Sequence, residues 1–175
     1  MELIGRMLDG SIPYSPTSAL EPAPSAASIN QDDKMERLET VPLFETCTRR
    51  QLRAIARIAG VFDAPAGTLL IRAGEPGEEF FLIVEGTARV HVSAKKRLRL
   101  QPGDYFGEMS LLDGGPRSAT VLAETPLRLL VINRRNFSEL LNEVPGMTQN
   151  LLATLCRRVR QAEKGLDIPR RRRGR

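Results

Sequence analysis

The chain has 175 residues, and its 26 basic and 21 acidic side chains give it a formal net charge of +5. This length is sufficient for one domain with a sizeable core and two tails. Nine basic and only two acidic residues lie in 157–175, so the remainder is slightly acidic, and a surface that is basic throughout, as nucleic-acid-binding proteins often have, is excluded.

Residues 1–33 are predicted to form a flexible N-terminal arm, because prolines and small polar residues dominate and few side chains could fill a core. A short helix at the very start that docks on a partner is an open alternative. The main domain is expected to span 34–166, with ordered structure from about Met35. Its first capped helix follows Thr48, which has capping-box spacing to Gln51, and ends at Gly60.

From Val61 to Ile132 the sequence alternates short runs of Val, Ile, Leu and Phe with turns that contain Gly and Pro. This pattern predicts many short strands in a sandwich or barrel. Alternation in 88–93 and 97–100 predicts strands with one buried and one solvated face, so Leu98 is expected to be buried. Helical periodicity returns after Asn133, as an N-cap, and in a stripe from Met147 to Ala162. The predicted fold class is α+β.

The segment 103–121 carries the most specific chemistry. Backbone N–H groups at the start of a short helix at Gly107 can donate to an anion, and Arg117 can donate two hydrogen bonds to phosphate oxygens. Glu108 would repel bare phosphate, so we expect it to accept a hydrogen bond from a hydroxyl group such as that of a ribose, with Arg117 offsetting its charge. These residues predict a sugar phosphate ligand. The alternative is that Glu108 and Arg117 only pair with each other.

Two stretches, FGEMSLL at 106–112 and PRSATV at 116–121, resemble the phosphate-binding cassette of cyclic nucleotide-binding domains. This family occurs in catabolite-activator-type regulators, protein kinase A regulatory subunits and cyclic nucleotide-gated channels. The resemblance extends from about Leu38 to Leu166. It implies an antiparallel β-roll, similar to a jelly roll, with an N-terminal helix and two C-terminal helices, of which the last, Met147 to about Lys164, closes over the base.

The resemblance also implies a set of ligand-binding residues. Glu108 would bind the ribose 2′-hydroxyl, and the other members would hold the cyclic phosphate through side chains and backbone amides. The full set is Gly107, Glu108, Met109, Ser110, Arg117, Ser118 and Ala119. The hydroxyl residues that contact adenine in some members have no clear match at 160–163, so cAMP is favoured as the ligand and cGMP stays possible.

We therefore predict a cytoplasmic, non-catalytic cyclic nucleotide sensor that repositions its C-terminal helices to signal to an effector protein that the sequence does not identify. Two distant cysteines, one histidine and no Walker motif argue against a disulfide framework, a metal site, histidine-based catalysis and nucleotide hydrolysis. The longest apolar runs are too short for a membrane span.

Other interpretations concern partners. The last helix could form a homodimer. Few residues follow Gly165, so DNA recognition by this chain alone is not expected. The basic tail, 167–175, could contact nucleic acid or an anionic membrane electrostatically, even in a structural domain whose pocket stays empty, or it could serve only solubility.

Overall fold

A computed structural model of the protein describes residues 29–92 and 97–164. The predicted basic tail and nearly all of the predicted N-terminal arm lie outside these ranges. In chain order the elements are α2 (Gln31–Glu39), η2 (Pro42–Phe44), α3 (Arg49–Ile58), β1 (Gly60–Ala64), β2 (Leu69–Ile71), β3 (Glu79–Glu85), β4 (Ala88–His91), β5 (Arg97–Leu100), β6 (Tyr105–Phe106), α4 (Glu108–Asp113), β7 (Thr120–Ala123), β8 (Leu127–Asn133), α5 (Arg134–Glu143) and α6 (Pro145–Lys164).

Local capping explains where the helices begin. The predicted capping box is present at α3: Thr48 accepts a hydrogen bond from the Gln51 backbone, and the Gln51 side chain accepts one from the Thr48 backbone. The side chain of Asn133 caps α5 in the same way as predicted. Helix α2 begins at Gln31, earlier than the ordered start expected near Met35, because the Asn30 side chain accepts a hydrogen bond from the backbone N–H of the third helical residue.

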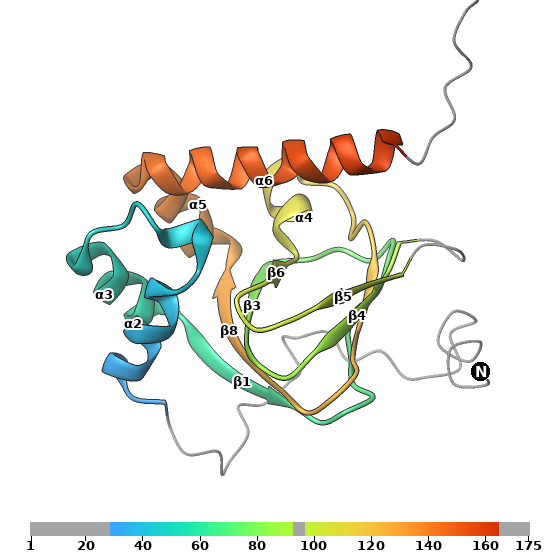
Figure 1. The fold of residues 1–175 in the computed structure, drawn as a ribbon, viewed down its shortest axis with the longest axis horizontal. Helices are drawn as coiled ribbons and strands as arrows, with labels where there is room; N and C mark the ends of the chain where they lie inside the picture. Colours follow the sequence, from blue (N-terminus) through green and yellow to red (C-terminus); the bar gives the residue numbers. More distant parts are fainter. Residues whose placement is uncertain (1–28, 93–96, 165–175) are drawn as a thin grey trace, which may run out of the picture.

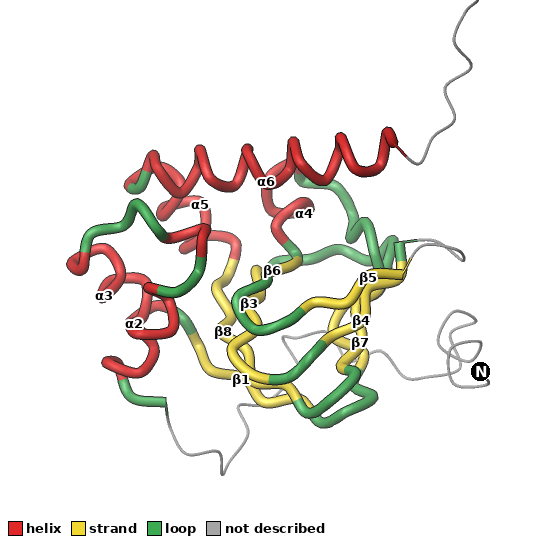
Figure 2. Tube along the Cα trace, in the orientation of Figure 1, coloured by secondary structure: helices red, strands yellow, loops and turns green. Residues whose placement is uncertain are grey.

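The predicted α+β class is confirmed. Two antiparallel four-stranded sheets, with strand orders β1-β8-β3-β6 and β2-β7-β4-β5, form a β-roll that the helices cover on one side (Figures 1 and 2). Strand β3 is apolar on both faces because each face meets a core. Phe81 and Ile83 point into the roll, whereas Phe80 and Leu82 pack against the helices.

Aromatic contacts join the helices to the roll. The Phe80 ring stacks on Phe137 of α5 with their centroids 4.9 Å apart, and both side chains are fully buried. Phe81, on the other face of β3, stacks on Phe106 at 4.8 Å. Phe106 immediately precedes Gly107, so this contact attaches the start of α4 to the core of the roll.

The expectation for β5 was wrong in one respect. Leu98 was expected on a buried face, but it is 49% exposed. The reason is topological: β5 is the edge strand of its sheet and pairs only with β4. Alternation along a strand determines which side chains lie on the same face, whereas the position of the strand in the sheet determines whether another element covers that face.

Helix α6 is the longest helix of the described structure, with 20 residues. It runs along one side of the molecule, past α5 and α4 (Figure 1). Among residues 29–92 and 97–164, no helix combines the length and the apolar character that a membrane span requires.

Candidate functional site

The segment that contains the predicted site lies between the β-roll and α6 (Figure 1). Gly107 is the N-cap of α4 and has a φ of +87°, which glycine adopts easily. A Cβ atom there would lie 2.7 Å from the backbone oxygen of Glu79 and 2.8 Å from Nη1 of Arg117. The position therefore requires glycine both for its backbone conformation and for the close approach of the arginine.

Arg117 is 3% exposed and joins the start of α4 to the start of β3. Its Nη1 donates to the backbone oxygen of Gly107 at 2.8 Å and to Oγ of Ser110 at 3.0 Å. Its Nη2 donates to the backbone oxygen of Glu79 at 3.0 Å and to Oε2 of the same residue at 3.3 Å. Each of these two nitrogens thus has one backbone acceptor and one side-chain acceptor. The backbone acceptors fix the plane and the direction of the guanidinium.

Glu108, the first residue of α4, is 2% exposed and contacts the C-terminal half of α6. Its Oε1 accepts a hydrogen bond from Nη1 of Arg158, which also donates to the backbone oxygen of Tyr105 at 3.3 Å and lies over the Tyr105 ring. Burial raises the pKa of Glu108, and the positive charge of Arg158 opposes this shift.

The two charges at the centre of the predicted site have different principal partners. Arg117 pairs with Glu79, and Glu108 pairs with Arg158, so the alternative in which Glu108 and Arg117 simply pair with each other is wrong. Arg117 also lowers the pKa of Glu108, but its effect is smaller than that of Arg158. The expectation that Arg117 offsets the Glu108 charge is therefore refined: both arginines act on this carboxylate, and Arg158 acts more strongly.

The remaining predicted residues are less buried than Arg117 and Glu108. Met109 and Ser118 are exposed, and the hydroxyl group of Ser118 donates to Sδ of Met109 at 3.3 Å. Ala119 is partly buried against the core of the roll. The structure thus places Gly107, Ser110 and Arg117 together at the inner end of the segment, and Met109 and Ser118 at its outer edge.

Helix α6 is anchored at its beginning and reaches the site near its end. Met147 and Leu151 are buried in the core that the helices share with β3. Nδ2 of Asn150 donates to the backbone oxygens of Pro42 and Leu43 in η2 at 3.2 and 3.3 Å. These contacts hold the first half of the helix, and Arg158 in its second half reaches Glu108.

Residues 61–144 match the family model described as the cyclic nucleotide-binding domain. This part of the chain belongs to that family. A cyclic nucleotide-gated potassium channel of Mesorhizobium japonicum is 38% identical over 118 residues, which are 67% of this chain and 33% of the channel. The cyclic AMP receptor protein of Thermus thermophilus is 37% identical over 109 residues, which are 59% of this chain and 50% of the receptor. The chain therefore spans a third to a half of these relatives.

Solved structures of related proteins share the fold. The catabolite activator protein of Thermus thermophilus superposes with a TM-score of 0.66 and 31% identity, over 73% of this chain and 62% of that one. The regulatory domain of Toxoplasma gondii protein kinase A, crystallised with cAMP, has a TM-score of 0.66 and 25% identity, over 75% of this chain and 51% of that one.

The cyclic nucleotide-binding domain contains a further connection that the sequence did not reveal. Arg134, the first residue of α5, donates from Nη2 to the backbone oxygens of Gly77 at 2.9 Å and Ser110 at 3.2 Å, and from Nε to Oε2 of Glu78 at 2.7 Å. It therefore ties α5 both to α4 and to the loop before β3. Its position next to the N-cap Asn133 was the only local signal, and that signal gives no indication of these distant partners.

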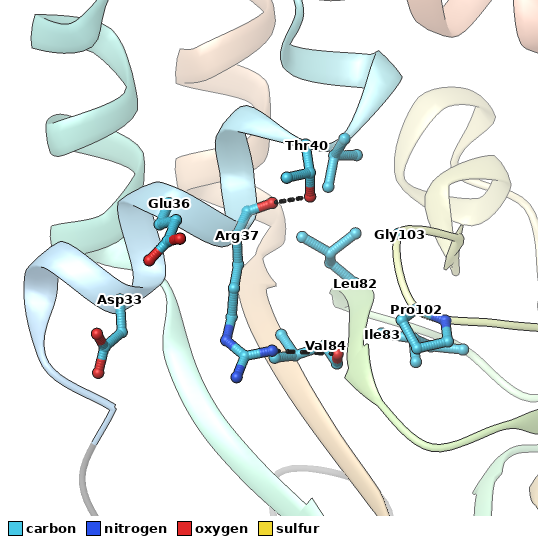
Figure 3. A pocket seen from close by; sticks show the side chains of 10 residues that line it. Asp33, Glu36, Arg37, Thr40, Leu82, Ile83, Val84, Pro102 and Gly103 are labelled. Carbon is cyan, nitrogen blue, oxygen red and sulfur yellow. Dashed lines mark hydrogen bonds between the residues drawn. The ribbon is translucent and has the colours of Figure 1, made fainter.

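A separate cavity of about 560 Å³ lies between α2, β3 and the turn before β6 (Figure 3). Arg37 at its edge pairs with Glu85 at 2.9 Å and donates to the backbone oxygen of Val84 at 3.4 Å, and Leu82 contributes apolar surface. These polar contacts join α2 to β3. The residues predicted to bind a sugar phosphate do not line this cavity and lie instead around Arg117.

Proposed function

We propose that this chain is a cyclic nucleotide sensor without catalytic activity, which binds cAMP in preference to cGMP. The observation that carries the proposal is the pair of buried charges, Arg117 and Glu108, held on either side of the Gly107 backbone. The preference for cAMP is supported by the names of the cyclic AMP receptor protein and of the cAMP complex among the relatives. Those names describe receptor and regulatory roles, which support a role in binding.

The cyclic phosphate would bind to Arg117. Its two side-chain acceptors, the Ser110 hydroxyl and the Glu79 carboxylate, can rotate away and leave Nη1 and Nη2 to donate to phosphate oxygens. The backbone acceptors would continue to hold the guanidinium in place, so little conformational entropy is lost on binding. Hydrogen bonds between guanidinium and phosphate are charge-assisted and can be bidentate, so they can replace the charge-assisted bonds to the Ser110 hydroxyl and the Glu79 carboxylate that are lost.

The ribose would bind to Glu108, whose carboxylate can accept a hydrogen bond from the 2′-hydroxyl. Met109, Ser118 and Ala119 would line the outer part of the same pocket. Because Arg158 already contacts this carboxylate, a ribose hydroxyl would share or replace that contact. The end of α6 would therefore change its position, or the population of its positions, when ligand binds. This movement is the signal that we propose an effector protein detects.

Helix α6 also offers a surface for assembly. Leu152 and Val159 are exposed on it. We include a homodimer through this helix in the proposal, since a second copy would cover these side chains and would sense the same movement.

Isothermal titration calorimetry with cAMP and cGMP tests the proposal. We expect the wild type to bind cAMP more tightly, and Arg117→Ala to weaken binding by about 100-fold or more, since hydrogen bonds to charged groups contribute about 1.5–3 kcal/mol each. Arg128→Ala is the control, because this arginine is also in an ion pair, with Asp63, and its side chain is 22% exposed. Absence of heat with both nucleotides at high micromolar concentration would refute the sensor. Equal affinity of Arg117→Ala and wild type would refute the role of Arg117.

A further inference from the structure

Glu79 places a carboxylate on the arginine that is proposed to bind the phosphate. We propose that this carboxylate makes Glu79 a specificity-determining residue, which selects singly charged cyclic phosphates over doubly charged phosphate monoesters such as 5′-AMP. The inference rests on the proposed function and goes beyond it, since it concerns how the site rejects the hydrolysed form of its ligand.

The backbone of Glu79 is fixed, whereas its side chain can rotate once the hydrogen bonds that its Oε2 accepts, from Arg117 and from the backbone N–H of Glu78, are broken. Glu79 pairs with Asn133 at one end of the central β3–β8 ladder, and the next residue, Phe80, is fully buried. Its backbone oxygen accepts a hydrogen bond from Arg117. The carboxylate, in contrast, belongs to a side chain that is 20% exposed. When a phosphate displaces it from Arg117, the carboxylate can turn toward water but must remain close to the site.

The charges around the site are balanced before the ligand arrives. They form three ion pairs: Arg117–Glu79, Arg158–Glu108 and Arg134–Glu78. A cyclic phosphodiester carries one negative charge and replaces the carboxylate of Glu79 on Arg117, so the charge that the guanidinium faces does not change. A phosphate monoester carries a charge of about −1.5 to −2 at pH 7. Its second charge has no corresponding cation among these three described pairs and faces the displaced carboxylate.

The size of this effect follows from Coulomb's law. A unit charge about 6 Å from a carboxylate, at an effective dielectric constant of about 40, changes affinity about tenfold. Replacing Glu79 by glutamine removes one such repulsion for a singly charged ligand and two for a doubly charged one. The ratio of the two affinities should therefore change by about tenfold.

Isothermal titration calorimetry with cAMP, 5′-AMP and the methyl ester of 5′-AMP tests the inference. Ligands that bind weakly are measured by competition against cAMP. The ester carries one charge but lacks the cyclic phosphate, so it separates charge from ring geometry. In Glu79→Gln we expect 5′-AMP to gain about tenfold more affinity than cAMP, with the ester gaining as cAMP does. Glu78→Gln is the matched control: this neighbouring carboxylate is 65% exposed and pairs with Arg134, so its removal should change the ratio much less than Glu79→Gln does.

A measurement on the wild type keeps the inference testable if Glu79→Gln does not fold. The phosphate of 5′-AMP loses its second charge below a pKa of about 6. The ratio of the affinity for cAMP to the affinity for 5′-AMP should therefore fall about tenfold between pH 8 and pH 5. Glu108 faces the ribose that both nucleotides share, so its titration cancels in this ratio. An unchanged ratio in Glu79→Gln, an equal gain for the ester and 5′-AMP in that variant, or a wild-type ratio that is the same at pH 8 and pH 5 would overturn the inference alone. Absence of cAMP binding by folded wild type would overturn the proposed function with it.

Discussion

Replacing Arg158 by alanine should destabilise the protein to an extent that depends on pH. The substitution leaves the buried carboxylate of Glu108 without the guanidinium that now pairs with it. Breaking a fully buried ion pair costs about 3–5 kcal/mol. The Arg158 side chain is 42% exposed, and solvent screening lowers this figure, so we expect a loss of about 1–2 kcal/mol at pH 8.

The sign of the pH dependence follows from the Glu108 carboxyl group. Burial already raises its pKa, and loss of Arg158 removes the main opposing contribution, so the pKa rises further in the variant. The folded variant then binds a proton more tightly than the unfolded chain, whose glutamate pKa is about 4.3. Stability consequently falls as pH rises from about 4.3 through the raised folded pKa. The difference between wild type and variant should be small near pH 4.5 and largest at pH 8.

Urea unfolding followed by circular dichroism at pH 4.5 and pH 8 measures this difference. Arg157→Ala is the control, because the Arg157 guanidinium donates to Thr154 on the same helix. For this variant we expect only a small loss in the free energy of unfolding at both pH values. In a Glu108→Gln variant, adding Arg158→Ala should lower the free energy of unfolding only slightly further, because the buried negative charge is already absent. Equal losses for Arg158→Ala at both pH values, or equal losses for the two arginine variants, would refute the reasoning.

Two further predictions concern the backbone at the site and a surface ion pair. Gly107→Ala should lower the free energy of unfolding more than Gly103→Ala in urea titrations. Both glycines have positive φ, which costs an alanine about 1–2 kcal/mol, but only a Cβ at position 107 would meet the Glu79 backbone. Equal losses in the two variants would contradict this prediction. Hydrogen bonds from Arg99 and Arg89 lower the pKa of Glu124 to about 2. The contribution of the ionised Glu124 to the free energy of unfolding is therefore present above about pH 4.3 and is lost as pH falls toward 2. Melting temperatures of Glu124→Gln should therefore fall less steeply than those of the wild type over this range, and parallel curves would contradict the assignment.

Local signals in the sequence were sufficient for most of the fold. The capping residues Thr48 and Asn133 predicted where two helices begin, because a cap needs only residues three positions apart. Gly and Pro marked the turns between strands for a similar reason. The solvent exposure of Leu98 could not be predicted this way, because it depends on which strand lies at the edge of a sheet.

The sequence by itself determined the residue types of the candidate site: Gly107 at a tight turn, Glu108 at the start of a short helix and Arg117 ten positions after the glycine. Only the tertiary structure decided which charge each one faces. Arg117 faces Glu79, which is 38 residues away, and Glu108 faces Arg158, which is 50 residues away. Caps and turns depend on neighbouring residues, whereas these ion pairs form only after the sheets and α6 have packed together, so the partners of a buried charge cannot be read from local spacing.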